Sequence, residues 1–399
     1  MDIIKQLYEM TAFQNFIDSP GTLIMVAIGF FVLYLGIKKA YEPLLLVPIG
    51  FGIILANALG GGMSVVSNSQ IEHLTLIEIA KEFGIMNMLY YSLIKTGLLP
   101  PIIFMGVGAL TDFGPMLRNL RLTFFGGAAQ IGIFSVLMAA IFLGFSHKEA
   151  ASLGIIGGAD GPTAIYTTII LAPHLLGPIA IAAYSYMALV PVIIPLVVKL
   201  TMNKKDLMIN MKEQDRLFPK KREIKNIKRA KIIFPIVVGA IVSVAVPSAV
   251  PLVGMLLFGN LIKEIGSLTE RLHKAASGGI MNTATIFLGL LVGATMTVDS
   301  FLNYKTLMII AGGFIAFCIS IAGGIYAAKT YNLFFKKKIN PLIGATGLSA
   351  VPMASRVANE ISLKHDPHNH ILHYAMASNI AGVIGSAVAA GVLISILNV

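Results

Sequence analysis

The stretch GGADGPT at residues 157–163 interrupts a long apolar segment that extends from Ala150 to Ala172. It carries one carboxylate, Asp160, and a charge at membrane depth is energetically costly. The glycines and the proline are expected to break the helix and to free backbone carbonyls. Because a broken helix with a buried carboxylate is typical of cation sites in transporters, the stretch predicts such a site.

The composition places the whole chain in a membrane. Of its 399 residues, 56% are hydrophobic and 12% are charged. Apolar runs of roughly 17–25 residues, the length that spans a bilayer, recur along the chain. The net charge of +11 is concentrated in a few loops, which indicates an orientation signal and not nucleic-acid binding. We therefore expect an all-α polytopic membrane protein.

Apolar segments are expected on both sides of a polar linker at residues 201–230. Six of them form a first membrane repeat at residues 1–200, and six form a second at 231–399. They lie near 21–37, 43–59, 86–110, 121–144, 148–171 and 174–199, and near 231–246, 250–266, 279–298, 305–328, 339–358 and 370–397.

Two motifs recur in the second half at nearly the same spacing. Val-Gly-Ala at 107–109 returns 185 residues later at 292–294, and GADGPTAI at 158–165 returns 186 residues later as GATGLSAV at 344–351. The interrupted segment is the fifth in each half, as in transporters with paired broken helices. The sequence therefore predicts two repeats, each with one broken or re-entrant hairpin, at 148–171 and 339–358.

The basic residues predict which side each loop faces. The linker is the most basic region and is expected in the cytoplasm; it contains Lys204, Lys205, Lys212, Lys220, Lys221, Arg222, Lys225, Lys228 and Arg229, followed by Lys231. If both hairpins return to the side from which they enter, the halves are inverted and both termini lie outside. Lys336–Lys338 then also lies in the cytoplasm.

Two hairpins that enter from opposite faces would bring their tips, 158–163 and 344–349, together. These tips offer the carboxylate of Asp160, free carbonyls, and the hydroxyls of Thr163, Thr346 and Ser349. A hard cation prefers such an all-oxygen shell. Alternatively, Asp160 caps the second half-helix, with Pro162 in its first turn, and the two roles are compatible.

Arg356 is a second charge in an apolar context, seven residues after Ser349. On one continuous helix the two residues would share a face, and an arginine in a cavity could hold a carboxylate with two hydrogen bonds. The alternative is an arginine at the cytoplasmic membrane edge, extended toward water or paired with Glu360. Position alone favours this alternative.

Three more polar side chains lie in or beside apolar segments. Asn340 begins the second hairpin and Asn379 lies in the last segment, and each is either a helix–helix hydrogen-bonding group or a ligand. For Tyr186, packing with a satisfied hydroxyl is the default interpretation.

Together these residues resemble the beta subunit of the sodium-pumping biotin-dependent decarboxylases, the family of oxaloacetate, methylmalonyl-CoA and glutaconyl-CoA decarboxylase. The resemblance covers nearly the whole chain and is carried by GGADGPT at 157–163, NPLIGA at 340–345 and the run from Ser349 to Arg356. It implies a subunit that removes carbon dioxide from carboxybiotin, exports sodium ions and consumes a proton.

The resemblance also implies individual roles. The implied catalytic residues are Asp160, Tyr186, Arg356 and Ser349; carboxybiotin would contact Arg356, Ser349 and Gly344; sodium would bind Asp160, Asn340, Asn379, Gly344 and Ser349. The implied partners are a carboxyltransferase alpha subunit, a biotin carrier that brings the carboxybiotin and a small single-span membrane subunit. A homo-oligomer is compatible with the sequence. Without the resemblance, the same residues fit a sodium–carboxylate symporter equally well.

Overall fold

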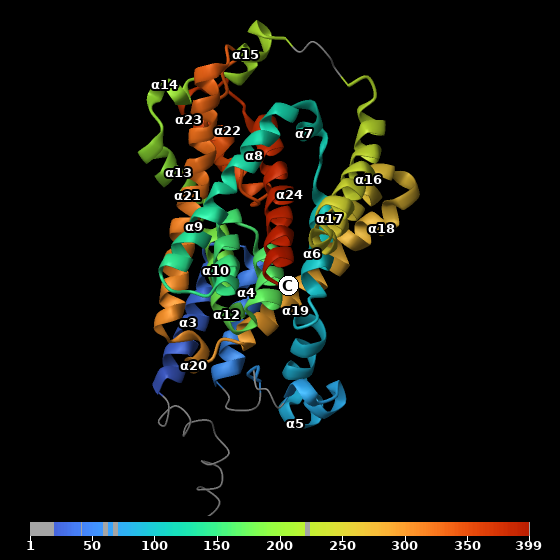
Figure 1. The fold of residues 1–399 in the computed structure, drawn as a ribbon, viewed down its shortest axis with the longest axis vertical. Coiled ribbons are helices and arrows are strands. Elements are labelled where there is room, and N and C mark those ends of the chain that lie inside the picture. The colour runs from blue at the N-terminus through green and yellow to red at the C-terminus, as the bar shows by residue number, and fades with distance from the viewer. Residues whose placement is uncertain (1–19, 41, 59–62, 67–70, 220–223, 399) are drawn as a thin grey trace, which may run out of the picture.

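The computed structural model describes residues 20–40, 42–58, 63–66, 71–219 and 224–398 (Figure 1). Within these ranges it contains helices and no strand. Six helices are long and apolar enough to cross a membrane, or up to eight if each of two bent pairs counts as one span. The expectation of an all-α polytopic membrane protein is confirmed. The N-terminal residues 1–19, the C-terminal residue 399 and the basic residues Lys220, Lys221 and Arg222 lie outside the described ranges.

The helices of the first half precede the linker helices α14 and α15. They are α3 (Pro20–Ile37), α4 (Pro43–Ala58), α5 (Leu76–Leu89), α6 (Leu99–Leu110), α7 (Gly114–Arg118), α8 (Thr123–Ala129), α9 (Ile131–Phe142), α10 (His147–Gly154), α11 (Gly161–Leu171), α12 (Leu176–Ala188) and α13 (Val190–Thr201), followed by α14 (Lys204–Leu207) and α15 (Met211–Leu217).

The second half contains fewer and longer helices. They are α16 (Ile227–Ala245), α17 (Val250–Ile265), α18 (Glu270–Lys274), α19 (Met281–Ala294), α20 (Val298–Phe301), α21 (Tyr304–Phe334), α22 (Leu342–Ala345), α23 (Met353–His365) and α24 (Leu372–Leu397). Short helical turns connect several of these: η1 (Ile71–His73), η2 (Tyr90–Ile94), η3 (Leu120–Leu122), η4 (Ile155–Gly158), η5 (Pro173–Leu175), η6 (Pro247–Ala249), η7 (Ser267–Thr269) and η8 (Ala275–Ile280).

The third apolar segment, expected at 86–110, is preceded by a further helical stretch. This stretch begins at Leu76, because the Thr75 side chain accepts from the Glu78 N–H while the Glu78 carboxylate accepts from the Thr75 N–H. A kink at Gly84, which has a non-helical φ of 81°, separates it from the expected segment. The segment then bends by 62° between η2 and α6, where Gly97 has a positive φ of 71°.

The two predicted hairpins are both broken helices. The first consists of α10, η4 and α11, and its chain reverses at Ala159, which adopts a left-handed φ of 56°. The second consists of α22 and α23, which are separated by non-helical residues 346–352. Figure 1 shows α22 and α23 near the top of the molecule and α10 below its middle.

Helices from different halves pack closely at several places, and two of these contacts occupy matching positions in the two halves. Helix α4 lies against α19, where a Cβ on Gly293 would overlap the backbone carbonyl of Ile49. Helix α17 lies against α6, where a Cβ on Gly108 would overlap the backbone carbonyl of Leu256. Only glycine permits backbones to approach this closely, as is common between membrane helices.

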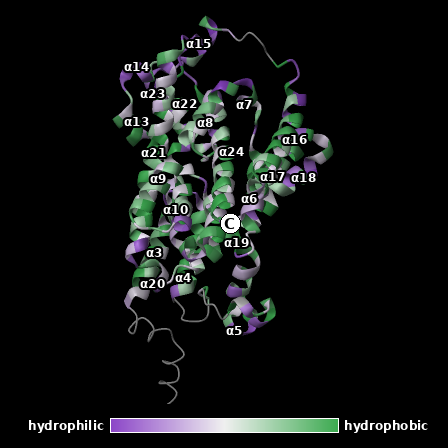
Figure 2. Cartoon of the chain, in the orientation of Figure 1, coloured by the Kyte–Doolittle hydropathy of each residue, from purple (hydrophilic) through white to green (hydrophobic). Residues whose placement is uncertain are grey.

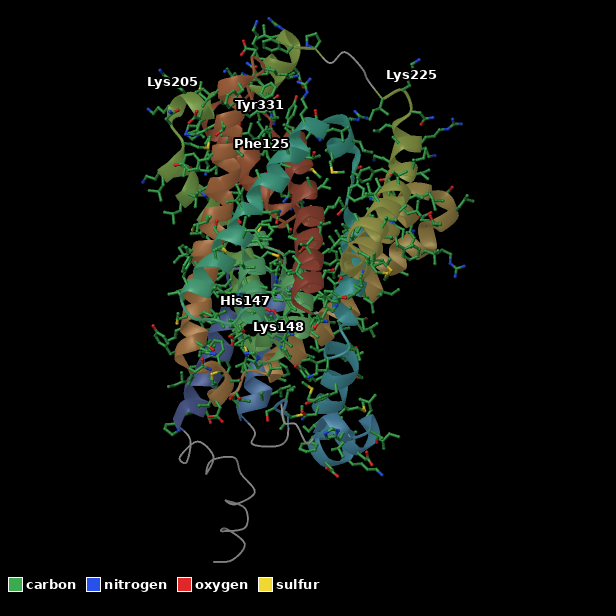
Figure 3. All side chains as sticks on the ribbon, viewed as in Figure 1. Phe125, His147, Lys148, Lys205, Lys225 and Tyr331 are labelled. Carbon is green, nitrogen blue, oxygen red and sulfur yellow. The ribbon has the colours of Figure 1, made fainter. Side chains whose placement is uncertain are left out.

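The polar residues gather at the two ends of the molecule, above and below a predominantly apolar middle (Figure 2). Lys205 and Lys225, from the two ends of the basic linker, lie at the top (Figure 3). The linker also contacts the loop after α21, because Lys337 Nζ lies 2.6 Å from Asp215 Oδ1. The two most basic regions of the chain therefore share one end of the molecule.

Candidate functional site

The tips of the two hairpins meet. The backbone N–H of Ser349 donates a 3.0 Å hydrogen bond to the carbonyl of Gly158. Gly158 also lies against the last helix, since a Cβ there would be 3.0 Å from Ser386 Cβ. The prediction that the two interrupted segments come together is confirmed at the backbone.

Asp160 lies at this junction and is 6% exposed. It is the N-cap of α11, because its Oδ1 accepts a 3.3 Å hydrogen bond from the Thr163 N–H. Its Oδ2 accepts a 3.0 Å hydrogen bond from Ser386 Oγ. The capping alternative is therefore confirmed, and the second carboxylate oxygen remains directed at the junction.

A chain of hydroxyls connects this carboxylate to the second hairpin. Ser386 Oγ lies 2.7 Å from Ser349 Oγ, and Ser386 is fully buried in α24. A hydroxyl has one hydrogen, and Ser386 Oγ also lies 3.0 Å from Val383 O. In the rotamer that donates to Asp160, Ser386 accepts from Ser349. One residue of each hairpin and one of α24 thus share a continuous hydrogen-bonded path.

Two further buried oxygens beside Asp160 have no hydrogen-bond partner among the described residues, the hydroxyls of Thr163 and Tyr184. The Tyr184 ring lies directly against Gly161, where a Cβ would overlap it. Buried polar groups are normally paired, so such oxygens mark positions that a ligand can satisfy. A carboxylate with several neutral oxygens is the donor set of a hard cation.

Asn340 and Gly344, by contrast, contact other parts of the chain. The Asn340 amide donates to Leu207 O (3.2 Å) and Ile209 O (3.0 Å) of the linker. Gly344 packs against Gly324 of α21, where neither backbone leaves room for a Cβ. These two residues therefore hold the base and the first arm of the second hairpin in this structure.

Asn379 and Thr346 fix the loop of the second tip. Asn379 donates from its amide to Leu348 O and accepts a 3.3 Å hydrogen bond from Ser355 Oγ. Thr346 donates to Ile343 O and Ala375 O, at 2.8 and 2.9 Å.

Arg356 and Tyr186 also lie away from the Asp160 carboxylate. The argument that Ser349 and Arg356 share a helix face is wrong, because α23 begins only at Met353 and the preceding residues are not helical. Arg356 is exposed on α23. The Tyr186 hydroxyl donates to Ile310 O of α21.

Sequence reasoning did not select Ser386, Tyr184 or Gln130, although the structure brings all three to the hairpin tips. Ser386 had a detectable signal, because it lies two helical turns after Asn379 and so on the same face of α24. Tyr184 was passed over in favour of Tyr186. Gln130 has no local signal, since its position depends on how α8 and α9 pack.

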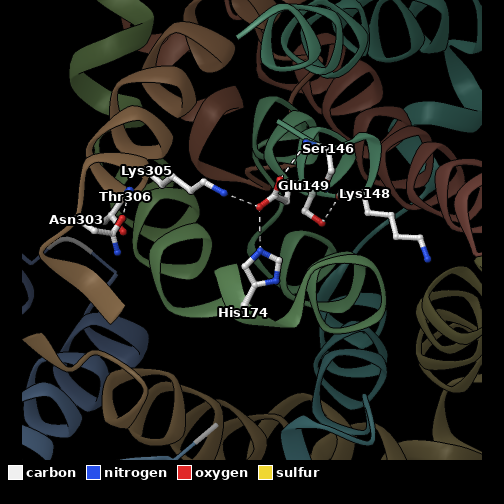
Figure 4. Close-up of polar contacts among 8 residues, drawn as sticks. Ser146, Lys148, Glu149, His174, Asn303, Lys305 and Thr306 are labelled. Atoms are coloured by element: carbon white, nitrogen blue, oxygen red, sulfur yellow. Dashed lines mark hydrogen bonds and ion pairs between the residues drawn. The ribbon is translucent and has the colours of Figure 1, made fainter. Parts of the chain in front are cut away.

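The base of the first hairpin is held by contacts of the Glu149 carboxylate with His174 and Lys305 (Figure 4). Glu149 Oε1 lies 2.9 Å from His174 Nε2 and 3.2 Å from Lys305 Nζ. Glu149 also forms a reciprocal cap with Ser146 at the start of α10. One carboxylate therefore joins the start of the first arm to η5, which follows the second arm, and to the first turn of α21.

Comparisons with known proteins identify the family. A family model described as the Na⁺-transporting oxaloacetate decarboxylase beta subunit matches residues 21–397. The methylmalonyl-CoA decarboxylase subunit beta of Propionigenium modestum is 46% identical over 405 residues, covering 99% of each chain. The oxaloacetate decarboxylase beta chain of Klebsiella pneumoniae is 42% identical over 420 residues, covering 94% of each. The methylmalonyl-CoA decarboxylase subunit beta of Veillonella parvula is 45% identical over 380 residues, covering 95% of this chain and 94% of its own. The chain therefore belongs to the beta-subunit family of the Na⁺-transporting oxaloacetate decarboxylases.

Proposed function

We propose that this chain decarboxylates carboxybiotin delivered by a carrier subunit and couples the reaction to sodium export across a bacterial cell membrane. The observation that carries the proposal is the path Asp160–Ser386–Ser349, which joins a buried carboxylate on one hairpin to a hydroxyl on the other. The contacts alone support a cation site of unspecified function, and family membership supports this particular activity.

Several contacts support two inverted repeats. The Val-Gly-Ala motifs occupy matching close contacts on α6 and α19, at Gly108 and Gly293. The unusually wide helical turns η2 and η8 begin at Tyr90 and Ala275, 185 residues apart, in the same register. Such turns are rare, so their recurrence favours a common plan for both halves.

The hairpins are too short to cross a bilayer with one arm. Helix α11 has 11 residues, which span about 16 Å of a hydrocarbon core about 30 Å thick. Four apolar segments separate the linker from Lys336–Lys338, so the two lie on one side of the membrane whether or not the hairpins are re-entrant, in agreement with the contact between Lys337 and Asp215. With the basic linker in the cytoplasm, re-entrant hairpins leave five crossings in each half and put both termini outside.

Carboxybiotin would approach from the linker end. A cavity of about 1210 Å³ lies there, with Arg118, Arg121, Lys225 and Lys337 in its wall, and with Ile339 next to the base of the second hairpin. A basic cavity attracts an anionic carboxylate. Arg356, on the same hairpin, would then hold the carboxylate as the substrate moves inward.

In the reaction, the bond between the biotin ring nitrogen and the carboxylate carbon breaks, carbon dioxide leaves and the nitrogen takes up a proton. Tyr186 is a candidate donor, acting after its hydroxyl leaves Ile310 O. Sodium would bind oxygens of Asp160 and Ser349, with Asn340, Asn379 and the Gly344 region shaping the second hairpin. A proton or a sodium ion can each neutralise Asp160, so the two would compete for it and be carried in opposite directions.

The proposed reaction needs partner subunits, because the carboxybiotin is formed outside this chain. A carboxyltransferase alpha subunit would load the biotin carrier, and a small single-span subunit would assist in the membrane. Relatives named for methylmalonyl-CoA and for oxaloacetate are similarly close to this chain, at 46% and 42–43% identity. The acyl substrate would therefore be chosen by the carboxyltransferase.

The test replaces Asp160 by Asn in the assembled complex. Asn retains the size of the side chain but cannot neutralise a cation, so sodium-dependent release of carbon dioxide from carboxybiotin should be lost. Asp299→Asn, in the first turn of α20, is the matched control and should leave the rate unchanged. Full activity in Asp160→Asn would disprove the central role of this carboxylate.

The competing function is a sodium–carboxylate symporter. The symporter and the pump are distinguished by supplying a dicarboxylate to vesicles that contain the chain without its carrier. Sodium-driven uptake would support the symporter, whereas carbon dioxide release that requires both sodium and the carboxybiotinyl carrier supports the pump.

A further inference from the structure

Gln130 is a buried glutamine at the junction of α8 and α9, and it is 7% exposed. Its Nε2 lies 2.9 Å from Gly126 O and 3.4 Å from Gly382 O. Because both neighbours are acceptors, only the NH₂ end can face them. The orientation of the amide is therefore set by its surroundings, and Oε1 must point elsewhere.

The Oε1 atom faces the tip of the first hairpin. A Cβ on Gly158 would be 3.7 Å from Gln130 Oε1 and 3.0 Å from Ser386 Cβ. Ser386 in turn binds Asp160 and lies within hydrogen-bonding distance of Ser349 Oγ. The amide oxygen therefore borders the same small region as the carboxylate and the two serine hydroxyls.

This oxygen has no hydrogen-bond partner in the part of the chain that the structure describes. Six buried side-chain atoms there share this property, and three of them, on Gln130, Thr163 and Tyr184, surround the first hairpin tip. An unpaired buried acceptor is costly, and such atoms are rare in native proteins. Their concentration at one place marks a site that a cation or an ordered water can fill during the cycle.

Helices α8 and α9, which Gln130 connects, contact both hairpins. A Cβ on Gly347, in the second tip, would lie 2.5 Å from Phe125 O of α8, and one on Gly157, in the first tip, would lie 3.0 Å from Gly132 C of α9. Movement of either hairpin would therefore change the distance between Gln130 and the ion.

We propose that Gln130 Oε1 is a ligand of the transported cation. This inference rests on the proposed function, because it assigns one more oxygen to the same cargo. A neutral amide oxygen adds coordination without adding charge, which suits a monovalent ion that must bind and then leave.

The experiment uses two substitutions in the complete complex. Gln130→Met keeps the length of the side chain but removes both the oxygen and the NH₂ group, and it should raise the half-saturating sodium concentration for carbon dioxide release by about tenfold. Half-saturation by the carboxybiotinyl carrier should stay unchanged. In Gln130→Glu, burial against the carbonyls of Gly126 and Gly382 favours the protonated acid, whose O–H can donate to them while its carbonyl oxygen replaces Oε1, so sodium half-saturation should return close to that of the wild type.

Binding is measured separately as the rise in thermal midpoint that added sodium produces, which should be weakened in Gln130→Met. The control is Gln214→Met, since the Gln214 oxygen already accepts a 2.8 Å hydrogen bond from the Lys338 N–H. A sodium half-saturation that matches the wild type in Gln130→Met would refute the assignment. Equal loss of turnover in both variants at unchanged sodium half-saturation would also refute it, because that result indicates a structural role. Sodium-independent activity of the wild type would instead refute the proposed function.

Discussion

At the residue scale, the site depends on Ser386 as much as on Asp160. The serine hydroxyl is the one side-chain group in the described structure that reaches both the Asp160 carboxylate and the Ser349 hydroxyl. If the ion displaces this hydrogen bond, the serine becomes a ligand; if not, the serine orients the carboxylate toward the ion.

Ser386→Ala tests this link. Hydrogen bonds to charged groups contribute about 1.5–3 kcal/mol, so sodium half-saturation should rise by roughly tenfold or more. The measurement is carbon dioxide release as a function of sodium concentration. Ser395→Ala, which removes an exposed hydroxyl from the same helix at its 2.6 Å contact with Ser248, should change nothing. An unaltered sodium dependence in Ser386→Ala would show that Asp160 binds the ion without help from α24.

The residues that sequence reasoning identified are those with a local signal. Asp160 and Ser349 were predictable because a broken apolar run and a recurring motif mark both tips. Gln130 was not, because its environment is created by α24 and the first hairpin, which are distant in sequence. Tyr184 and Tyr186 lie about 200° apart around one helix, so only the packing of α12 decides which of them faces Asp160.

At the element scale, the first hairpin is attached at its base by Glu149 and at its tip by hydrogen bonds. The Glu149 side chain is 11% accessible, whereas those of His174 and Lys305 are 59% and 61% accessible. Fully exposed ion pairs contribute about 0–1 kcal/mol each, and these pairs are exposed only at the His174 and Lys305 ends. The base is therefore held by a buried carboxylate whose partners can turn into water, which suits an element proposed to move during transport.

Glu149→Gln should loosen the base without unfolding the hairpin. Gln removes the charge that His174 and Lys305 share, but it can still complete the cap with Ser146. Amides in the first turns of α10 should exchange with deuterium faster, while the thermal midpoint falls only slightly. The control is Glu270→Gln, whose pair with Lys274 lies within one exposed helix and should leave α10 unaffected. Unchanged exchange in α10 would show that the cap alone holds the base.

At the scale of the whole molecule, the two halves are interlocked and do not lie side by side. Helix α4 of the first half packs on α19 of the second, and α17 of the second packs on α6 of the first. Each contact has a side-chain amide beside it: Asn57 donates to Met296 O at 2.7 Å, and Asn260 donates to Thr111 O at 2.8 Å. Such a frame would stay rigid while the hairpins move.

The interlocking predicts equal sensitivity at two matched positions. A Cβ on Gly108 or Gly293 would overlap backbone carbonyls, which no rotamer change can relieve. Gly108→Ala and Gly293→Ala should therefore each destabilise the protein by about 1–3 kcal/mol, the usual cost of overpacking. Gly278→Ala is the control, since nothing lies within 4 Å of a Cβ there. The chain has no tryptophan and a single cysteine, so unfolding can be followed by the heat-induced reaction of Cys318 with a thiol-specific dye. If only one of the two substitutions lowered the midpoint, the two contacts would not be equivalent parts of one repeated frame.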